Sequence, residues 1–386
     1  MTSIHLEPAV TPLPSTYPFR VAYDASAFLS WNGGKGKGVQ LNNLLGNYTS
    51  QFIGLAPPGK NYAAHAIIQD GLARYQTWQQ ISLPMLLRKW RADFFLAPYN
   101  IAPLVIPKRT RLILVLHDLI LLEKQFDPSD LRRKWNNKYR RFLIRQAVGR
   151  AEIVLTVSHY SRLQIEGRFP GVRVRVIPCR ISASWFTSRE VARPRDRRNC
   201  IVLVSGNAPH KNLDRALEGF ALFVGKVDRR FSPHLRLVGL SDSEAMFRRK
   251  AEHLRIGDLV SVEPYLTEGE LQNLYRGSRA AFIPSLMEGF GIPVLEAMAS
   301  GTPVIASNTT SLPEVGGTAA AYFDPTDPRA MAETLAHVLT SDERQQEMIE
   351  RGFIQARQFH PDAVNRQVSR FWETLACGVT PVDSPK

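Results

Sequence analysis

Residues 282–304 read FIPSLMEGFGIPVLEAMASGTPV, and this stretch decides how the chain is interpreted. An apolar run ending at Ile283 gives way to a glycine-containing turn, and Pro293 then occupies the early helical position that proline favours. A strand, a turn and a helix in this order leave free backbone N–H groups at the positive end of the helix. Such an end binds phosphate without a metal ion, because unpaired amides and aligned peptide dipoles both attract negative charge.

Two carboxylates frame this turn. Seven residues separate Glu288, in the turn, from Glu296, about one helical turn further on, so both lie near the same end of the helix. They would repel phosphate, but paired carboxylates accept hydrogen bonds from the neighbouring hydroxyl groups of a sugar. The alternative is an ordinary first helical turn with acidic residues near its dipole. The spacing alone leaves both interpretations open.

The stretch resembles the Glu-x7-Glu motif of retaining glycosyltransferases of family four, which have the GT-B fold. The match continues on both sides, at residues 269–275 (GELQNLY), 304–307 (VIAS), 311–317 (SLPEVGG) and 322–325 (YFDP). The resemblance implies an α/β protein of two Rossmann-like domains facing across a cleft, with a nucleotide sugar as donor. The residues that it assigns to the donor are Glu288 for the transferred sugar, Glu296 for the nucleotide ribose, and Phe290, Gly291 and Ile292 for the sugar or diphosphate.

Two α/β patterns follow one another along the chain. The first has expected strands at 19–24, 52–55, 94–97, 112–116, 153–157 and 172–177, and the second at 200–205, 235–238, 259–262, 280–283 and 303–306. Strands that alternate with helical segments predict parallel, doubly wound sheets. We therefore expect a first domain over 1–190, a polar, Arg-rich linker over 191–199 and a second domain over 200–360. By the resemblance, the first domain binds the acceptor, the second binds the nucleotide sugar, and a helix within 361–386 crosses back to the first.

Two loops after expected strands are candidates for binding the donor phosphates. Loop 206–212 resembles the family's Gly-x4-Lys-Asn variant, which starts at Gly206 and would place the Lys211 cation against the diphosphate. Many relatives carry Arg after the glycine; here Asn207 either donates a neutral hydrogen bond or leaves a first-domain lysine to compensate. In loop 33–38 (GGKGKG), Gly33 and Gly34 permit a close approach of backbone amides to the donor.

His117 directly follows the expected strand 112–116, at the carboxyl end where such sheets bind ligands. A histidine there can hydrogen-bond a sugar hydroxyl or orient an acceptor, and His117-Asp118 is similar to the family's His-Asp element. The run SHYS at 158–161 resembles a Ser-x-x-Ser segment that caps a helix, so His159 is not assigned a catalytic role.

The charge is divided unevenly along the chain. Residues 1–200 hold 30 Lys and Arg against 12 Asp and Glu, whereas residues 201–386 hold 19 against 23. A basic half predicts an anionic partner, such as nucleic acid, phospholipid head groups or a pyrophosphate-linked lipid, or else a solvated surface.

The amphipathic segment 131–147 is the clearest feature of the basic half. It carries one apolar stripe among seven Lys and Arg, formed by Leu131, Trp135, Tyr139, Phe142 and Leu143. Either the segment lies on an anionic membrane, or the stripe packs on the sheet and the cations face solvent or the acceptor.

Composition bounds the remaining classes. A chain of 386 residues with 44% apolar residues supports a large core in two domains. No apolar run approaches the length of a membrane span, and the N-terminus lacks a signal-peptide pattern, so we expect a cytosolic protein that is either free or peripheral on the inner face of the membrane. Three widely spaced cysteines fit reduced thiols and offer no zinc pattern, so we expect no metal and no cofactor besides the nucleotide-sugar substrate.

The resemblance, together with these patterns, implies a retaining, metal-independent hexosyltransferase of polysaccharide or glycolipid synthesis. Mannose from GDP-mannose is the preferred donor, and the acceptor is a glycan or a polyprenyl-diphosphate-linked glycan. Three alternatives stay open: a UDP-sugar-dependent transferase of the same fold, a GT-B nucleotide-sugar epimerase, and a non-catalytic basic protein that binds nucleic acid or acts as a scaffold. No recognised nucleic-acid-binding motif supports the last of these.

Overall fold

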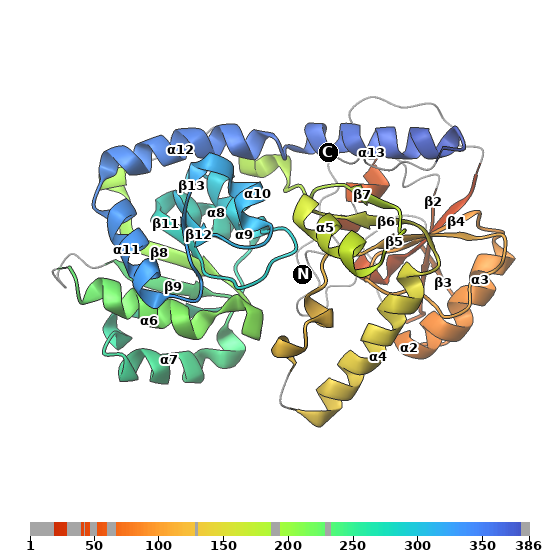
Figure 1. Cartoon of the computed structure of the whole chain (residues 1–386), viewed down its shortest axis with the longest axis horizontal. Coiled ribbons are helices and arrows are strands. Elements are labelled where there is room, and N and C mark those ends of the chain that lie inside the picture. Colours follow the sequence, from red (N-terminus) through yellow and green to blue (C-terminus); the bar gives the residue numbers. More distant parts are fainter. Residues whose placement is uncertain are drawn as a thin grey trace. The chain divides into compact units, whose positions relative to one another are not determined.

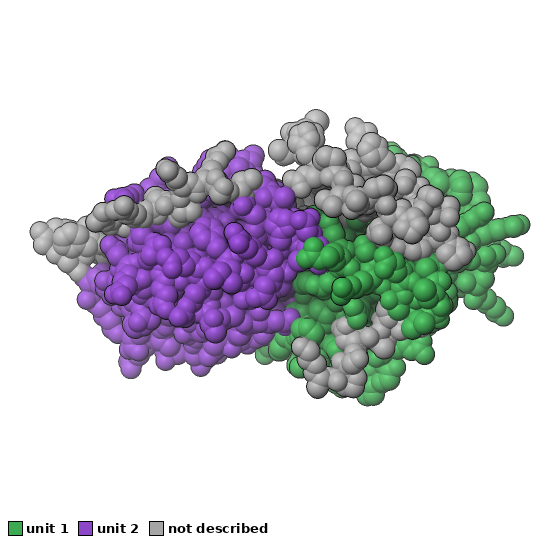
Figure 2. Space-filling view, turned by 90° about the horizontal axis from the view of Figure 1, so that it is seen from above, with its two compact units in different colours: residues 1–180, 364–386 green, residues 181–363 purple. Residues whose placement is uncertain are grey.

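The computed structural model describes residues 19–28, 40–46 except 42, 52–59, 67–127, 130–186, 194–227 and 233–379. The chain forms two compact units, one of residues 1–180 with 364–386 and the other of residues 181–363 (Figure 2). The expected domain boundary at residue 190 falls outside the described residues, and the units divide between Arg180 and Ile181. Among the helices of the described ranges, none combines the length and apolar character needed to cross a membrane.

The first unit is built on a parallel sheet (Figure 1). Its strands are β1 (Val21–Asp24), β2 (Phe52–Ala56), β3 (Ile67–Gln69), β4 (Phe94–Ala97), β5 (Arg111–Val115), β6 (Ala151–Thr156) and β7 (Val174–Val176). They lie in the order β3-β2-β1-β4-β5-β6-β7, and each neighbouring pair is parallel. The order 3-2-1-4-5-6 is that of the Rossmann fold, which reverses direction between β1 and β4.

Helices cover both faces of this sheet. The helices include α2 (Tyr75–Thr77), α3 (Leu83–Lys89), α4 (Leu131–Val148) and α5 (His159–Arg168). Of these, α3, α4 and α5 bury side chains on one face of the sheet. The other face packs against α13 (Pro361–Ala376), where the Trp372 ring lies 4.8 Å from that of Phe52 and its indole N–H donates to the Leu44 carbonyl at 2.9 Å. The last helix of the chain therefore completes the core of the first unit.

The second unit repeats the same topology. Its strands are β8 (Arg198–Val204), β9 (His234–Val238), β10 (Val260–Glu263), β11 (Ser278–Ile283), β12 (Val304–Ser307) and β13 (Ala320–Phe323). They lie in the order β10-β9-β8-β11-β12-β13 and are all parallel, so the order reverses between β8 and β11. The helices are α6 (Leu213–Val224), α7 (Glu244–His253), α8 (Glu268–Gly277), α9 (Ile292–Ala299), α10 (Leu312–Gly316), α11 (Pro328–Leu339) and α12 (Asp342–Arg357).

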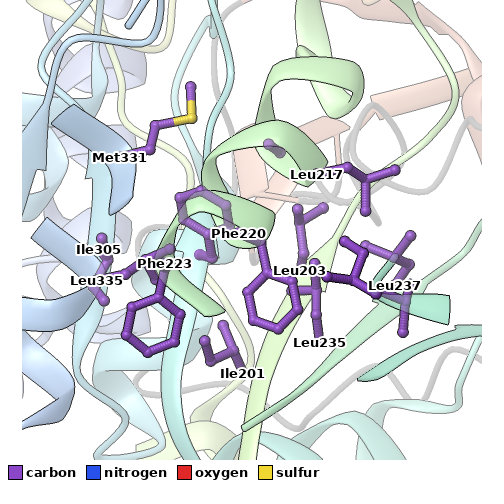
Figure 3. Close-up of a cluster of buried hydrophobic side chains, with 14 of the residues drawn as sticks. Ile201, Leu203, Leu217, Phe220, Phe223, Leu235, Leu237, Ile305, Met331 and Leu335 are labelled. Carbon is purple, nitrogen blue, oxygen red and sulfur yellow. The ribbon is translucent and has the colours of Figure 1, made fainter. Parts of the chain in front are cut away.

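The core of the second unit joins α6 and α11 to the sheet (Figure 3). Phe220 and Phe223 of α6 lie over side chains of β8 and β9, and Met331 reaches the same cluster from α11. The two helices can approach closely because Gly219 has no side chain: a Cβ atom there would lie 2.8 Å from Cβ of Met331. This packing holds β8, whose carboxyl end leads to Gly206 and Lys211, rigidly in the sheet.

The eleven predicted strands are all present, with ends shifted by at most two residues. Strands β3 and β13 were not predicted. Each lies at an edge of its sheet, β3 is only three residues long, and three of the four residues of β13 are partly exposed, so neither shows an apolar alternation that would reveal it.

The expected linker 191–199 ends earlier than predicted, because β8 already begins at Arg198. The guanidinium of the preceding Arg197 is buried and donates to the carbonyls of Ser278 at 3.0 Å and Gly301 at 2.7 Å. Burial lowers the pKa of Arg197 to about 10. Arg197 therefore anchors the start of β8 in the second unit, although the segment around it has the polar, Arg-rich composition of a linker.

Helix α4 exposes most of its apolar stripe. The exposed fractions are 72% for Leu131, 68% for Trp135, 42% for Tyr139 and 48% for Phe142. The helix instead buries Ile144, Ala147 and Val148, which at 100° per residue lie away from the stripe, and Leu143, which lies at its border. Of the five predicted stripe residues only Leu143 is buried, so the prediction that the stripe packs against the sheet is contradicted for the other four.

Candidate active site

The site predicted in the second unit lies at the point where the strand order reverses. Lys211 ends the loop that follows β8, and Glu288 lies in the loop that follows β11, the neighbouring strand. The amide of Leu286 donates to the carbonyl of His210 at 2.8 Å, so the two loops are joined directly. In open parallel sheets this is the position at which ligands bind.

Lys211 and Glu288 form an ion pair. Nζ of Lys211 lies 2.6 Å from Oε1 of Glu288, which also accepts a hydrogen bond from the Ser285 hydroxyl at 2.7 Å. The two side chains keep 22% and 12% of their surface exposed, so the pair is largely screened from water but accessible. Burial alone would raise the pKa of Glu288, but the charge and hydrogen bond of Lys211 and the hydrogen bond of Ser285 outweigh it, and this pKa is lowered.

Two hydroxyl residues after β12 hold the backbone of the Glu288 loop. The amide of Glu288 donates to the hydroxyl of Thr310 at 3.1 Å. The hydroxyl of Ser311 donates to the carbonyls of Glu288 at 3.0 Å and Phe290 at 2.9 Å. Because the loop is fastened from a neighbouring strand end, the Glu288 carboxylate is presented in one place, which suits a group that must contact a substrate.

Gly291 ends the loop and begins α9 without a side-chain cap. Its φ of 106° lies in the region that favours glycine, and Pro293 occupies the first turn as predicted. Glycine has no side chain to cap the first amides, and no side chain of the described residues is recorded as accepting from them, so the positive end of the helix is available to an anion. These first amides include those of Gly291 and Ile292, to which the resemblance assigned a sugar or a diphosphate.

We expect Gly291→Ala to destabilise the protein by about 1–3 kcal/mol, because it combines backbone strain with a clash. A Cβ atom at this position would lie 2.8 Å from Cδ2 of Leu312. Urea unfolding of the variant measures the loss. Gly206→Ala is the matched control, since nothing lies within 4 Å of a Cβ atom there, and equal stability losses in the two variants would contradict the geometric argument.

Glu296 lies in α9 and is partly buried. Burial raises the pKa of its carboxyl group to about 8, with the charge of Glu268 as the second cause. Among the described residues no hydrogen-bond donor and no cation pairs with this carboxylate. A partly buried carboxyl group without a protein partner can bind the vicinal hydroxyls of a ribose, which is the role that the resemblance assigned to it.

Asn207, which stands where many relatives carry arginine, makes a hydrogen bond within the second unit. Its side-chain amide donates to the hydroxyl of Ser243, which precedes α7, at 2.8 Å. This hydrogen bond therefore joins the loop after β8 to the segment between β9 and α7. Lys211 is thus the cation that the loop after β8 brings to Glu288.

His117 lies at the carboxyl edge of the first sheet, as predicted. Its ring nitrogen Nε2 lies 3.1 Å from the carbonyl of Pro98, and because a carbonyl only accepts, Nε2 carries the proton in this contact. Its amide donates to the Asn100 side chain at 3.0 Å. Ser158 caps α5 by accepting from the amide of Ser161, which confirms the capping role predicted for that segment.

A further group at this edge was missed by sequence reasoning. Asp24 ends β1 and accepts hydrogen bonds from the Ser26 amide at 3.0 Å and the Tyr75 hydroxyl at 2.9 Å. Burial raises the pKa of Asp24 to about 6, against the lowering effect of these bonds. Nothing in the sequence pairs Asp24 with a tyrosine fifty-one positions later. Gly33 and Gly34 lie outside the described residues.

The fold and the site define a GT-B glycosyltransferase: two Rossmann-like units, with a lysine, two carboxylates and an uncapped helix start at the reversal point of the second. The chain belongs to the family-four glycosyltransferases. Residues 186–355 match the family model described as glycosyl transferases group 1, and residues 55–185 match the model described as glycosyltransferase family 4.

Curated relatives and solved structures agree with this assignment. O-antigen chain mannosyltransferase B of Escherichia coli is 27% identical, over 69% of this chain and 71% of the relative. MMP alpha-(1->4)-mannosyltransferase of Mycolicibacterium hassiacum is 33% identical, but the match spans 49% of this chain and only 45% of that relative. Sucrose-phosphate synthase of Thermosynechococcus elongatus shares the fold, with a TM-score of 0.69 and 18% identity over 93% of this chain and 99% of the other.

Anabaena HepE, solved with UDP and glucose, also shares the fold. Its TM-score is 0.70 at 15% identity, over 92% of this chain and 99% of that one.

Proposed function

We propose that this glycosyltransferase moves a hexose with retention of configuration, and that the hexose is mannose from GDP-mannose. The observation that carries the proposal is the Lys211–Glu288 pair, which the structure places beside the uncapped start of α9. A cation and free amides suit a diphosphate, and a buried carboxylate suits sugar hydroxyls. Mannose is preferred because several relatives are named mannosyltransferases, among them the O-antigen enzymes of Escherichia coli and Salmonella typhimurium.

In the proposed mechanism, Lys211 leaves Glu288 when the donor binds and turns to the diphosphate. Glu288 then accepts hydrogen bonds from the sugar, while Glu296 accepts them from the ribose. The bond from the sugar C1 to the phosphate oxygen breaks as C1 bonds to the acceptor oxygen on the same face, and the acceptor proton passes to the departing phosphate. The amides of Gly291 and Ile292, with Lys211, stabilise the charge that develops on that phosphate. His117 is proposed to hold a hydroxyl of the sugar or acceptor.

A thermal-shift panel tests the donor assignment. GDP-mannose, UDP-glucose and ADP-glucose are compared with and without EDTA, on the wild type and on Glu296→Ala, since a ligand of the native state raises the melting temperature by mass action. The proposal expects a shift with GDP-mannose that survives EDTA and is lost in the variant. A shift with UDP-glucose alone would favour a UDP-sugar transferase, and a shift with none of them would favour a scaffold or nucleic-acid-binding role.

The transferred product separates the enzymatic alternatives. Incubation of GDP-mannose with a polyprenyl-diphosphate-linked glycan is expected to lengthen the glycan by one mannose in the α configuration, as read by NMR of the new anomeric centre. Consumption or epimerisation of the donor without any acceptor would instead indicate a nucleotide-sugar epimerase.

We also propose that the first unit works on the inner face of a membrane, through the exposed stripe of α4. Leu131, Trp135, Tyr139 and Phe142 are exposed side by side, and Nζ of Lys138 lies 5.0 Å from the centre of the Trp135 ring. Exposed aromatic side chains flanked by lysine and arginine suit the boundary between anionic head groups and acyl chains. A polyprenyl-linked acceptor would be presented at this surface.

The double variant Trp135→Ser with Phe142→Ser is expected to bind phosphatidylglycerol-containing vesicles at least tenfold more weakly than the wild type. Sedimentation with vesicles measures this, and binding of the wild type should weaken as salt rises. The control removes two exposed apolar side chains elsewhere, in Leu163→Ser with Ile354→Ser. Equal binding by all three proteins would remove α4 as the membrane surface.

A further inference from the structure

The chain enters the second unit through residues 181–186, which we call the entry segment. It contains the 3-10 turn Ala183–Phe186 and is fastened to α8 by side chains. The hydroxyls of Ser182 and Ser184 each lie 2.5 Å from Oε1 of Glu268, and Nε2 of Gln272 donates to the Ser184 hydroxyl at 3.1 Å. A single carboxylate oxygen therefore gathers two hydroxyl groups of the entry segment.

The same face of α8 holds the aromatic residue of the entry segment. Trp185 is buried, and its ring lies 6.2 Å from that of Tyr275. Glu268, Gln272 and Tyr275 are spaced i, i+4 and i+7, so they form one stripe along the helix. The entry segment is thus bound to α8 through the hydroxyl groups of Ser182 and Ser184 and through the ring of Trp185.

The stripe on α8 also lies against α9, the helix that carries Glu296, the residue proposed to bind the ribose. Helix α9 packs against both α8 and the entry segment. Within this packing the Glu296 carboxylate interacts electrostatically with Glu268 and with Tyr275. Glu268 and Tyr275, which contact the entry segment, therefore also act electrostatically on Glu296.

The position of Glu268 is not explained by helix capping. Thr267 and Glu270 already form a complete capping box at the start of α8, in which the Thr267 hydroxyl accepts from the Glu270 amide and the Glu270 carboxylate accepts from the Thr267 amide. A second acid at the first position adds little to that cap. Its carboxylate is instead hydrogen-bonded to the entry segment.

We propose that Glu268 is a positioning residue that couples binding of a nucleotide sugar at Glu296 to the conformation of the entry segment. The inference rests on the proposed role of Glu296. Ribose hydroxyls that donate to Glu296 stabilise its charged form and so place a second negative charge beside Glu268. Repulsion between the two charges moves the Glu268 carboxylate, and the hydroxyl groups of Ser182 and Ser184 follow it. Trp185, which is next to Ser184 in the sequence, then shifts against Tyr275.

Trp185 gives a direct readout, because it is the only tryptophan in the sequence of residues 181–363. The full chain is labelled with 5-fluorotryptophan, and the Trp185 resonance is assigned with Trp185→Phe. Addition of GDP-mannose, with UDP-glucose in parallel, is expected to shift this fluorine resonance in the wild type and in Glu270→Gln. Glu270→Gln is the matched control, because it removes a charge from the same turn and keeps the capping box.

In Glu268→Gln the shift is expected to disappear although calorimetry still detects the bound nucleotide sugar. The pair Ser182→Ala with Ser184→Ala should give the same result and covers the case in which Glu268→Gln does not fold. If the shift persists in both variants, or if the wild type binds without a shift, the coupling is wrong and the proposed function stands. If no nucleotide sugar binds the wild type, the proposed function fails and the coupling falls with it.

Discussion

Glu288→Gln is expected to lower kcat for sugar transfer by about 10²- to 10³-fold while leaving the fold intact. The substitution keeps the shape of the side chain and the hydrogen bond from Ser285, but it removes the charge that pairs with Lys211 at 2.6 Å. A neutral amide accepts more weakly from sugar hydroxyls, and it leaves Lys211 without the partner that aligns it before the donor arrives. Initial rates at saturating donor measure the loss.

A double-mutant cycle separates this role from a purely structural one. Because Lys211 and Glu288 act as one unit, the double variant Lys211→Met with Glu288→Gln should be little worse than the poorer single variant. Glu333→Gln is the control, since that glutamate is exposed and paired only with Lys226 at the surface. A Glu288→Gln enzyme with more than half of the wild-type kcat would remove Glu288 from the reacting centre.

The sequence predicts the parts of this site that lie close together along the chain. Glu288, Gly291, Pro293 and Glu296 belong to one strand–turn–helix unit, so their spacing alone places the two carboxylates near one helix end. The pairing of Lys211 with Glu288 was not predicted, because it depends on β8 and β11 being neighbours in the sheet. Local patterns are sufficient for the residues of this one unit.

Contacts between distant parts of the chain were not predictable. The hydroxyls of Ser182 and Ser184 meet Glu268 more than eighty positions later, and no periodic pattern marks such a contact. In helix α4, too, the sequence predicted the element but not its packing. Its periodicity predicted the helix, but only the packing of its C-terminal half, through Ile144 and Val148, decides which side faces the sheet.

Donor affinity is expected to strengthen about tenfold per pH unit between pH 6 and pH 7 and to level off above pH 8. Burial, with the charge of Glu268, raises the pKa of Glu296 to about 8, so most of the empty protein is protonated at this residue at pH 7. In the proposed binding mode the ribose hydroxyls donate to the ionised carboxylate, so the proton must leave before the donor binds. Calorimetry with GDP-mannose measures the slope, since its diphosphate does not titrate in this range.

Glu296→Gln should abolish the dependence of donor affinity on pH. It should also remove the loss of native-state stability that Glu296 causes as pH rises. A carboxyl group whose folded pKa lies above its unfolded value binds more protons in the native state, so it costs the native state stability as pH rises from about 4.5 to 8. The variant is therefore expected to be more stable than the wild type at pH 8 in urea and not at pH 4, while it binds GDP-mannose weakly at every pH. Glu333→Gln should keep the wild-type slope, and a wild-type Kd that is constant from pH 6 to pH 9 would show that Glu296 does not ionise to bind the donor.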